Sequence, residues 1–305
     1  MDLSTKHKGY WALAAISFFW GTTWFVSKLA IHDIPPLQLT GYRQTLAGLI
    51  LILFHFIKSK SLPTVKELGF HIILGFLFFT CSNGLTTFAI KYIPSFLGAL
   101  IGCLMPFIMI LANFLFYKEK VKPIILLALL IGFAGVATIL LSFSKEIEGG
   151  GNFLFGVLIT LLSVFTWTSG TLISTKNKLK INPYQGIGWQ MLFGGMMLYI
   201  SSMLFEQQVP IATIPFKAWA YFIYLTAIGS IFCFVCYLYA LKSLPISLVS
   251  IYVYINPIVA LGLGFLIINE TVTPQIVIGA CITFIGIYLV KRFNTLKPLR
   301  NLKKS

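Results

Sequence analysis

One charged residue, Arg43 in the stretch GYRQTL, lies well inside an apolar run of the sequence. It falls about six residues from the end of that run, roughly 9 Å at the 1.5 Å rise of a helix. A guanidinium at that depth faces an internal cavity, where it can bind a carboxylate or phosphate, or it extends along its helix to a polar surface. The sequence leaves both interpretations open.

Other polar and aromatic side chains lie at similar depth in other apolar runs. Trp20 and Trp167 occupy matched positions, and they either line a cavity or act as packing aromatics. The side chains that could stack with or hydrogen-bond to a small solute are the candidate substrate-binding residues Trp20, Arg43, Asn83, Thr86, Trp167, Gln190, Tyr252 and Asn256.

Two prolines and two glutamates lie at positions that shape helices. Pro106 and Pro257 each remove a backbone hydrogen bond and kink a helix, as a hinge or as a static bend. Glu119 and Glu270 follow two apolar runs and are expected to stabilise the turns there. Paired small residues such as Gly194-Gly195 and Gly262-x-Gly264 predict close contacts between helices.

The sequence lacks the groupings that most chemistry requires. No hydrolase, zinc-protease or phosphate-binding motif is present, so we expect no enzyme, metal or cofactor. Cys233-x-x-Cys236 has no second pair and is expected to pack inside a helix. The carboxylates all fall in loops or at the ends of apolar runs, which argues against coupling through a buried acid and favours facilitated diffusion or exchange. They are Asp2, Asp33, Glu67, Glu119, Glu146, Glu148, Glu206 and Glu270.

The elements that position these residues must be membrane helices. The 305 residues are 58% hydrophobic and 10% charged, with a mean hydropathy of +0.90, whereas a soluble domain carries about 25% charged residues. Each long apolar run can cross a bilayer as a helix. We expect ten transmembrane helices, near residues 10–30, 37–57, 69–90, 95–117, 123–143, 153–175, 184–205, 218–241, 246–268 and 274–292.

The positive charge follows the loops between these spans. Of the Lys and Arg residues, 18 fall on the side of the N-terminus and four on the other side. The positive-inside rule therefore predicts that both termini are cytoplasmic. The net charge of +15 thus reflects topology, with the lipid bilayer and not a nucleic acid as the partner.

The two halves of the chain repeat each other. Trp20, Pro36 and Gly48 match Trp167, Pro183 and Gly195 at an offset of 147, and Pro106, Glu119 and Gly135 match Pro257, Glu270 and Gly286 at an offset of 151. Because five spans is an odd number, the second unit is predicted to be inverted, as in many secondary transporters. The domains are then 1–145, an inverted repeat 146–295, and a basic cytoplasmic tail 296–305.

Several stretches resemble a known family. FFWGTTWFVSKLA, YRQTLAGLIL and FAIKYIPSFLGALIGCLMPFIMILANFLFYKEKV, with YALKSLPISLVSIYVYINPIVALGLGFLIINETV in the second half, are similar to EamA-type members of the drug/metabolite transporter superfamily. The resemblance implies a ten-helix carrier in the cytoplasmic membrane, typically an exporter of amino acids, other metabolites or toxic compounds. It carries over to Trp20, Gly21, Arg43, Pro106, Glu119, Pro257 and Glu270. Thr168 and Gln190 replace the expected Gly and Arg in the second half.

These observations predict a secondary transporter in the inner membrane of a bacterium. It would export amino acids, other small metabolites or toxic compounds by alternating access. The alternatives are an importer or exchanger of an anionic metabolite, suggested by Arg43, and a channel. The expected partners are a small-molecule substrate and the bilayer; a monomer would suffice, and the oligomeric state stays open.

Overall fold

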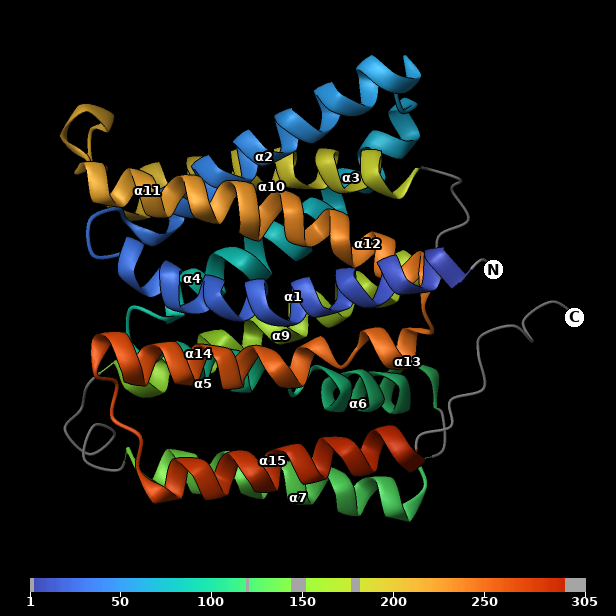
Figure 1. Cartoon of the computed structure of the whole chain (residues 1–305), viewed down its shortest axis with the longest axis vertical. Helices are drawn as coiled ribbons and strands as arrows, with labels where there is room; N and C mark the ends of the chain where they lie inside the picture. The colour runs from blue at the N-terminus through green and yellow to red at the C-terminus, as the bar shows by residue number, and fades with distance from the viewer. Residues whose placement is uncertain (1–2, 119–120, 144–151, 177–181, 294–305) are drawn as a thin grey trace, which may run out of the picture.

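A computed structural model describes residues 3–118, 121–143, 152–176 and 182–293. Helices that run side by side along one direction form the described part of the chain, which contains no strand (Figure 1). The first half contains α1 (Leu3–Ala30), α2 (Pro36–Ser59), α3 (Val65–Gly75), the π-helix η1 (Phe76–Gly84), α4 (Leu85–Ala89), α5 (Ser95–Gly102), α6 (Met105–Tyr117) and α7 (Pro123–Leu141).

The second half contains the equivalent elements and one extra turn. They are α9 (Phe153–Lys176), α10 (Pro183–Phe205), the 3₁₀ turn η2 (Ile211–Thr213), α11 (Phe216–Tyr224), the π-helix η3 (Leu225–Phe232), α12 (Cys233–Ser243), α13 (Ile246–Val249), α14 (Tyr252–Ile268) and α15 (Pro274–Phe293). Each span expected from the sequence is helical over most of its length.

Seven helical stretches of the described residues are long and apolar enough to cross a membrane: Val65–Ala89, Ser95–Ala112, Pro123–Leu141, Phe153–Thr175, Pro183–Phe205, Phe216–Ser243 and Pro274–Phe293. The apolar helix α14 is shorter, at 17 residues. The helices α1 and α2 have 28 and 24 residues and carry several of the polar side chains described below. Length and composition therefore indicate an all-helical membrane protein.

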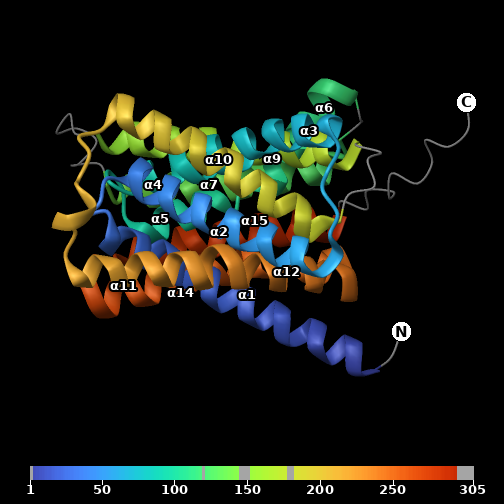
Figure 2. The same ribbon diagram turned by 90° about the horizontal axis from the view of Figure 1, so that it is seen from above.

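The two ends of the bundle can be told apart by the course of the chain. The described chain begins with α1 and finishes with α15 at the same end (Figures 1 and 2). Following the orientation predicted from the sequence, we call this the inner end and the opposite one, where α1 joins α2, the outer end. The expected second and seventh spans, α2 and α10, pack along each other, and α7 packs along α15 at the opposite edge of the bundle (Figure 1).

Glycines bring the backbones of these paired helices together. A Cβ atom on Gly48 of α2 would lie 2.5 Å from the backbone nitrogen of Leu192 on α10. One on Gly195 would meet the backbone nitrogen of Thr45. At the repeat offset of 147, Gly48 corresponds to Gly195 and Thr45 corresponds to Leu192. The second contact is therefore the first one with the two halves exchanged. Each glycine therefore lies where no larger residue fits without displacing backbone.

The other glycines singled out in the sequence behave differently from one another. A Cβ atom on Gly194 would lie 2.5 Å from the carbonyl oxygen of Gly75, so this glycine makes the close helix contact that the sequence predicts. The expectation for Gly262 is wrong, because no atom lies within 4 Å of a Cβ built there. Gly264 is crowded by the carboxylate of Glu270 instead of by another helix.

Two expected spans are divided where the sequence predicts one helix. Residues 103–104 separate α5 from α6, and residues 250–251 separate α13 from α14. Both breaks are tightened turns: the nitrogen of Leu104 donates to the oxygen of Ile101 at 3.0 Å, and that of Tyr254 to Ile251 at 3.0 Å. Such i to i−3 bonds locally change the direction of a helix.

Two further helices are widened in their middle. The π-helix η1 has nine residues and η3 has eight, and each lies between two α-helical pieces of a longer helix. They occupy overlapping places in the two halves, since residues 76–84 shifted by the repeat offset of 151 give 227–235, and η3 spans 225–232. Long π-helical segments are uncommon and are frequently found at functional sites.

Candidate functional site

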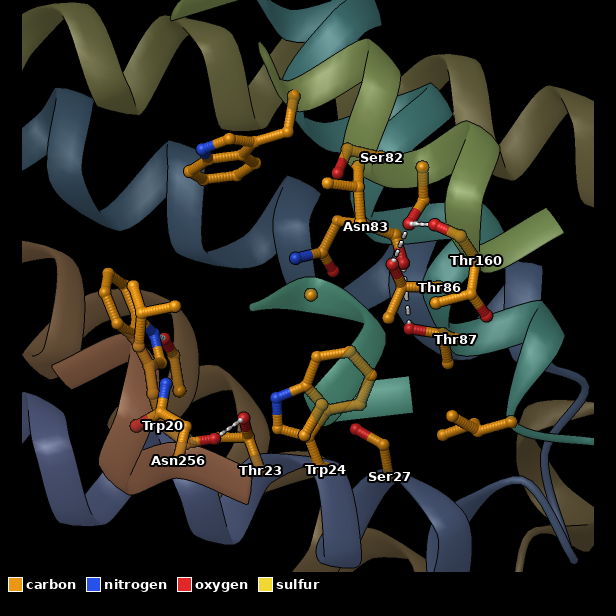
Figure 3. A pocket seen from close by; sticks show the side chains of 18 of the residues that line it. Trp20, Thr23, Trp24, Ser27, Ser82, Asn83, Thr86, Thr87, Thr160 and Asn256 are labelled. Carbon is orange, nitrogen blue, oxygen red and sulfur yellow. Dashed lines mark hydrogen bonds between the residues drawn. The ribbon is translucent and has the colours of Figure 1, made fainter. Parts of the chain in front are cut away.

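A cavity of about 200 Å³ lies in the middle of the bundle (Figure 3). We call it the central cavity. Helices from both halves line it: α1, α2, η1, α4, α5 and α6 from the first, and α9, η3, α12 and α14 from the second. Its side chains are largely hydroxyls, amides and aromatic rings, with one cation.

That cation is Arg43, which is only 6% exposed. Its Nη1 donates to Oγ of Ser230 at 3.2 Å, and its Nη2 donates to Oδ1 of Asn83, whereas its Nε has no partner. The only ion pair among the described residues joins His32 to Asp33, so no carboxylate there neutralises Arg43. A buried charge without a counter-ion is costly, which makes the cavity favourable for an anionic group.

Arg43 is held in place by the widened helix η1. Asn83 lies on η1, and its Oδ1 also accepts a bond of 3.4 Å from Nε2 of Gln44, the residue after Arg43. The π-helical turns therefore present an acceptor to two neighbouring side chains of α2. This arrangement fixes the guanidinium and removes the alternative in which Arg43 extends to the surface.

Hydroxyl groups cover another wall of the cavity (Figure 3). Thr86 on α4 donates to Oγ of Ser163 on α9 at 2.8 Å, and Ser163 donates to the carbonyl of Thr160 at 2.7 Å. Thr87 bonds to the carbonyl of Asn83 at 3.0 Å. Because hydroxyl oxygens have spare lone pairs, this wall can accept hydrogen bonds from a bound solute as well.

Aromatic rings form the remaining walls. The indole nitrogen of Trp20 donates to the carbonyl of Gly229 on η3 at 3.1 Å, so its ring is fixed. The ring lies 5.1 Å from that of Tyr252 and 5.1 Å from that of Phe234. Trp24 lies one turn further along α1 and projects into the same cavity (Figure 3). These rings exclude water and can stack on a flat or cationic group.

Asn256 and Tyr252 come from the kinked helix α14. With its amide oriented to satisfy hydrogen bonds, the nitrogen of Asn256 donates to the carbonyls of Ser17 at 2.9 Å and Tyr252 at 3.1 Å. Both residues line the central cavity. The amide therefore also links α14 to α1 across the two halves.

The two prolines act differently in their helices. Pro106 is the second residue of α6, where a helix has no backbone bond to lose. Pro257 lies inside α14 and leaves the carbonyl of Val253 without its helical donor. The thiol of Cys103, in the break between α5 and α6, donates to that carbonyl at 2.8 Å. The irregular parts of two helices from opposite halves are thus joined directly.

The glutamates expected at turns are only partly described. Glu119 lies outside the described residues. Glu270 accepts bonds from the backbone nitrogen of Ser95 at 2.9 Å and from its Oγ at 3.2 Å, at the first residue of α5. A carboxylate at a helix N-terminus is stabilised by the helix dipole. Nearby, the ammonium group of Lys28 donates to the carbonyls of Ile90 and Ile93, the latter at 2.9 Å.

Gln190 does not lie with the other candidates. It lines a second cavity of about 330 Å³, which we call the inner cavity, with His71, Trp167 and Tyr237 among its other walls. Trp167 and Phe234 line both cavities. Of the candidates named from the sequence, the central cavity therefore gathers Trp20, Arg43, Asn83, Thr86, Trp167, Tyr252 and Asn256.

Several lining residues were not among the sequence candidates. They are mostly small hydroxyl residues and one indole: Thr23, Trp24, Ser27, Ser82, Thr87, Thr160 and Ser163. Those of α1 lie three, four and seven residues after Trp20, so they share its helix face. That spacing from Trp20 is the feature of the sequence that could have identified them as lining residues. No cluster of three or more His, Cys, Asp or Glu side chains able to hold a metal ion occurs within the described ranges.

Comparison with known proteins shows similarity to transporters over most of the chain. The model of the EamA-like transporter family matches residues 7–141 and again residues 154–292. YoaV, an uncharacterized transporter of Bacillus subtilis (strain 168), is 28% identical over 279 residues, which cover 91% of this chain and 94% of YoaV. YedA, an uncharacterized inner membrane transporter of Escherichia coli (strain K12), is 27% identical over 263 residues, covering 86% of this chain and 83% of YedA.

Two further proteins match nearly the whole chain. The protein PecM of Dickeya dadantii (strain 3937) is 27% identical over 291 residues, 94% of either chain. A solved crystal structure superimposes with a TM-score of 0.63 over 95% of this chain and 96% of its own. At 17% identity that likeness is one of fold alone.

Proposed function

Because the chain belongs to the EamA-like transporter family, we propose that it is a secondary carrier that exports small metabolites across the cytoplasmic membrane of a bacterium. The membrane-spanning, transporter-related character of the chain is the established part. The solute, the direction and the mechanism are the proposal. The observation that carries it is the buried cation Arg43 in a cavity lined by both halves of the chain.

The chemistry of the central cavity supports a small solute with an anionic group. A volume of about 200 Å³ is below the range of roughly 300–1,000 Å³ that is common for drug-sized ligands. Arg43 would bind a carboxylate or phosphate, and the hydroxyl wall of Thr86 and Ser163 would bind its polar remainder. Trp20 and Trp24 would pack on the apolar or cationic part. An amino acid or a small organic acid meets these requirements.

Alternating access between two inverted five-helix repeats is the proposed mechanism. Ten spans with both termini cytoplasmic would place the Lys-rich loops at the inner end. Three paired features support the repeat: the exchanged contacts of Gly48 and Gly195, the matched π-helices, and a matched pair of amides. Gln38 donates to the carbonyl of Val209 at 2.7 Å, and Gln185, its counterpart at offset 147, donates to that of Ser61 at 3.0 Å.

Direction and type of transport separate the alternatives. Arg43 equally supports an importer or an exchanger of an anionic metabolite. A channel would give flux that does not saturate with solute and no counter-flow, whereas a carrier gives both saturation and counter-flow. None of the described residues that line the central cavity is a carboxylate, so the proposal includes no coupling through a buried acid.

The test is efflux from liposomes that contain the purified chain. They are loaded with labelled amino acids and small organic acids, and efflux is compared for the native chain, Arg43→Gln and Arg43→Lys. We expect Arg43→Gln to lower the efflux of anionic members about tenfold, since a charged hydrogen bond is worth about 1.5–3 kcal/mol. Arg43→Lys keeps the charge but not the fork of donors, and should lose less.

Lys217→Gln is the matched control. Lys217 is exposed at the outer end, and its ammonium group lies 5.8 Å from the ring centroid of Tyr221. The variant removes the same unit of charge away from the cavity, so its efflux should equal that of the native chain. Equal efflux from native protein and Arg43→Gln would reject the role of Arg43. Absence of efflux of every member would reject the proposed solute class.

A further inference from the structure

The inner cavity corresponds to the central cavity through the internal repeat. At offset 147, Trp24, Ser27 and Arg43 of the central cavity match Thr171, Ser174 and Gln190 of the inner one. A second set of lining residues matches at offset 151. In the central cavity they are Asn83, Thr86, Thr87 and Ile90, and their counterparts in the inner cavity are Phe234, Tyr237, Leu238 and Leu241. Equivalent helix faces of the two halves therefore contribute to the two cavities, the first half's to the central one and the second half's to the inner one.

The chemistry of the two chambers differs. Where the central cavity has Arg43, Asn83 and Thr86, the inner one has a neutral amide, a phenyl ring and a phenol. Among the polar side chains that line the inner cavity from outside this correspondence is His71 on α3, which is 3% exposed. None of its described lining residues carries a permanent charge.

His71 and Gln190 form a hydrogen-bonded pair in that cavity. Nε2 of the Gln190 amide lies 3.2 Å from Nδ1 of His71. An amide nitrogen only donates, so Nδ1 is the acceptor, and the proton of the neutral imidazole is on Nε2. That Nε2 is buried and has no partner. A buried N–H group without an acceptor costs free energy, which an incoming oxygen would recover.

A layer of aromatic rings separates the two cavities. Trp167 and Phe234 line both. The ring of Trp167 lies 4.8 Å from that of Phe78, and the ring of Phe234 lies 5.5 Å from that of Phe79. A solute could pass between the chambers only if these rings moved.

We propose that the inner cavity is a second solute-binding chamber, in which the His71–Gln190 pair donates a hydrogen bond to an anionic oxygen of the solute. It rests on the proposed carrier function and deepens it. The chamber binds the same carboxylate, sulfonate or phosphate chemistry as Arg43, but through a neutral donor. Trp167 and Phe234 form the partition between the two sites.

The experiment measures how fast a cysteine in the inner cavity reacts with two thiol reagents. The full chain carries Thr171→Cys, with Ser in place of the accessible Cys81, Cys236 and Cys281. The anionic probe is 2-sulfonatoethyl methanethiosulfonate, and the neutral probe is methyl methanethiosulfonate. The ratio of their rates reports on anion binding and cancels changes in access to the cavity.

We expect His71→Leu and Gln190→Leu each to lower this ratio about fivefold, the effect of about 1 kcal/mol for one hydrogen bond. Thr175→Val is the matched control. Thr175 lines the same cavity, and its hydroxyl bonds only to its own helix, at 2.9 Å from the carbonyl of Leu172. A second reporter, Thr23→Cys in the central cavity, should react equally with and without His71→Leu, which shows that the variant is folded.

Two results overturn the proposal: a ratio that His71→Leu leaves unchanged, or one that Thr175→Val lowers equally. Efflux is measured in the same vesicles. Efflux with an unchanged ratio rejects the inner chamber and keeps the carrier. A lowered ratio without efflux keeps the chamber and rejects the proposed export of these solutes.

Discussion

At the scale of single residues, the central cavity is built from polar groups that bond to the protein itself. Arg43, Asn83 and Ser230 form one such group, and Thr86 with Ser163 another. Each retains capacity for a further partner, because the guanidinium has a free Nε and hydroxyls have two lone pairs. The site is therefore ordered before a solute arrives, which lowers the entropic cost of binding.

Cys103 gives a prediction at this scale. Its thiol satisfies the carbonyl of Val253 that Pro257 leaves free. Cys103→Ala removes the donor and should lower the free energy of unfolding by about 1–2 kcal/mol, the cost of an unpaired buried carbonyl. Denaturant unfolding in detergent measures this.

Cys103→Ser serves as the control, because a hydroxyl also donates. It should recover at least half of the loss. If Cys103→Ala is as stable as the native chain, the bond contributes nothing and the two irregular helix segments are not energetically joined.

The sequence predicted most of these side chains from depth alone. Arg43, Asn83, Thr86, Tyr252 and Asn256 were recognisable because polar groups in an apolar helix need partners. Trp24 and Ser163 were not, since in a helix that is apolar all round the periodicity does not distinguish a cavity wall from a lipid face. Gln190 was recognised as polar, but its partner His71 depends on how α3 and α10 pack.

At the scale of elements, departures from regular helix concentrate around the cavity. The π-helices η1 and η3, the breaks at 103–104 and 250–251, and Pro257 all adjoin residues that line it. The sequence predicted where most of the helical segments lie, but not the π-helices or the breaks. These features depend on which carbonyl accepts the hydrogen bond of each backbone N–H group. The alternatives differ in free energy by about a few kcal/mol, and the amino-acid composition does not determine which one forms.

The helix pair α2–α10 gives a prediction at this scale. Gly48→Ala places a methyl group 2.5 Å from the backbone nitrogen of Leu192, and overpacking of this kind costs about 1–3 kcal/mol. We expect a lower melting temperature, measured by the unfolding of purified protein in detergent.

Gly262→Ala is the matched change inside α14, where no atom lies within 4 Å of the new methyl group. It should be neutral or stabilising, by up to about 1 kcal/mol, because alanine favours a helix over glycine. Equal melting temperatures for Gly48→Ala and Gly262→Ala would show that the α2–α10 contact tolerates displacement.

At the scale of the whole molecule, a connection at the outer end joins the two halves. Ser95 begins α5 in the first half, and Glu270 follows α14 in the second; the carboxylate accepts two bonds from Ser95. If the halves rock against each other, this contact must break in each cycle. A short thiol cross-linker between Ser95→Cys and Glu270→Cys should therefore reduce efflux to background, and reduction of a cleavable linker should restore it.

The uncross-linked double variant and the linker on native protein control for the mutations and the reagent. Full efflux through quantitatively cross-linked protein would contradict rocking about this end. It would leave the central cavity as a site but require another movement to open it.

The pair Arg43 and Gln190 has one more consequence. If the two repeats are inverted as proposed, a symmetric dimer of one repeat would present identical binding cavities to a solute on both faces of the membrane. Fusion of two repeats in one chain allows the two cavities to differ, with the cation Arg43 in the central one and the neutral amide of Gln190 in the inner one. A passive carrier with unequal binding cavities cannot move solute uphill, but its half-saturation concentration can differ between the two faces. Restoring the cation with Gln190→Arg should bring these two concentrations closer together.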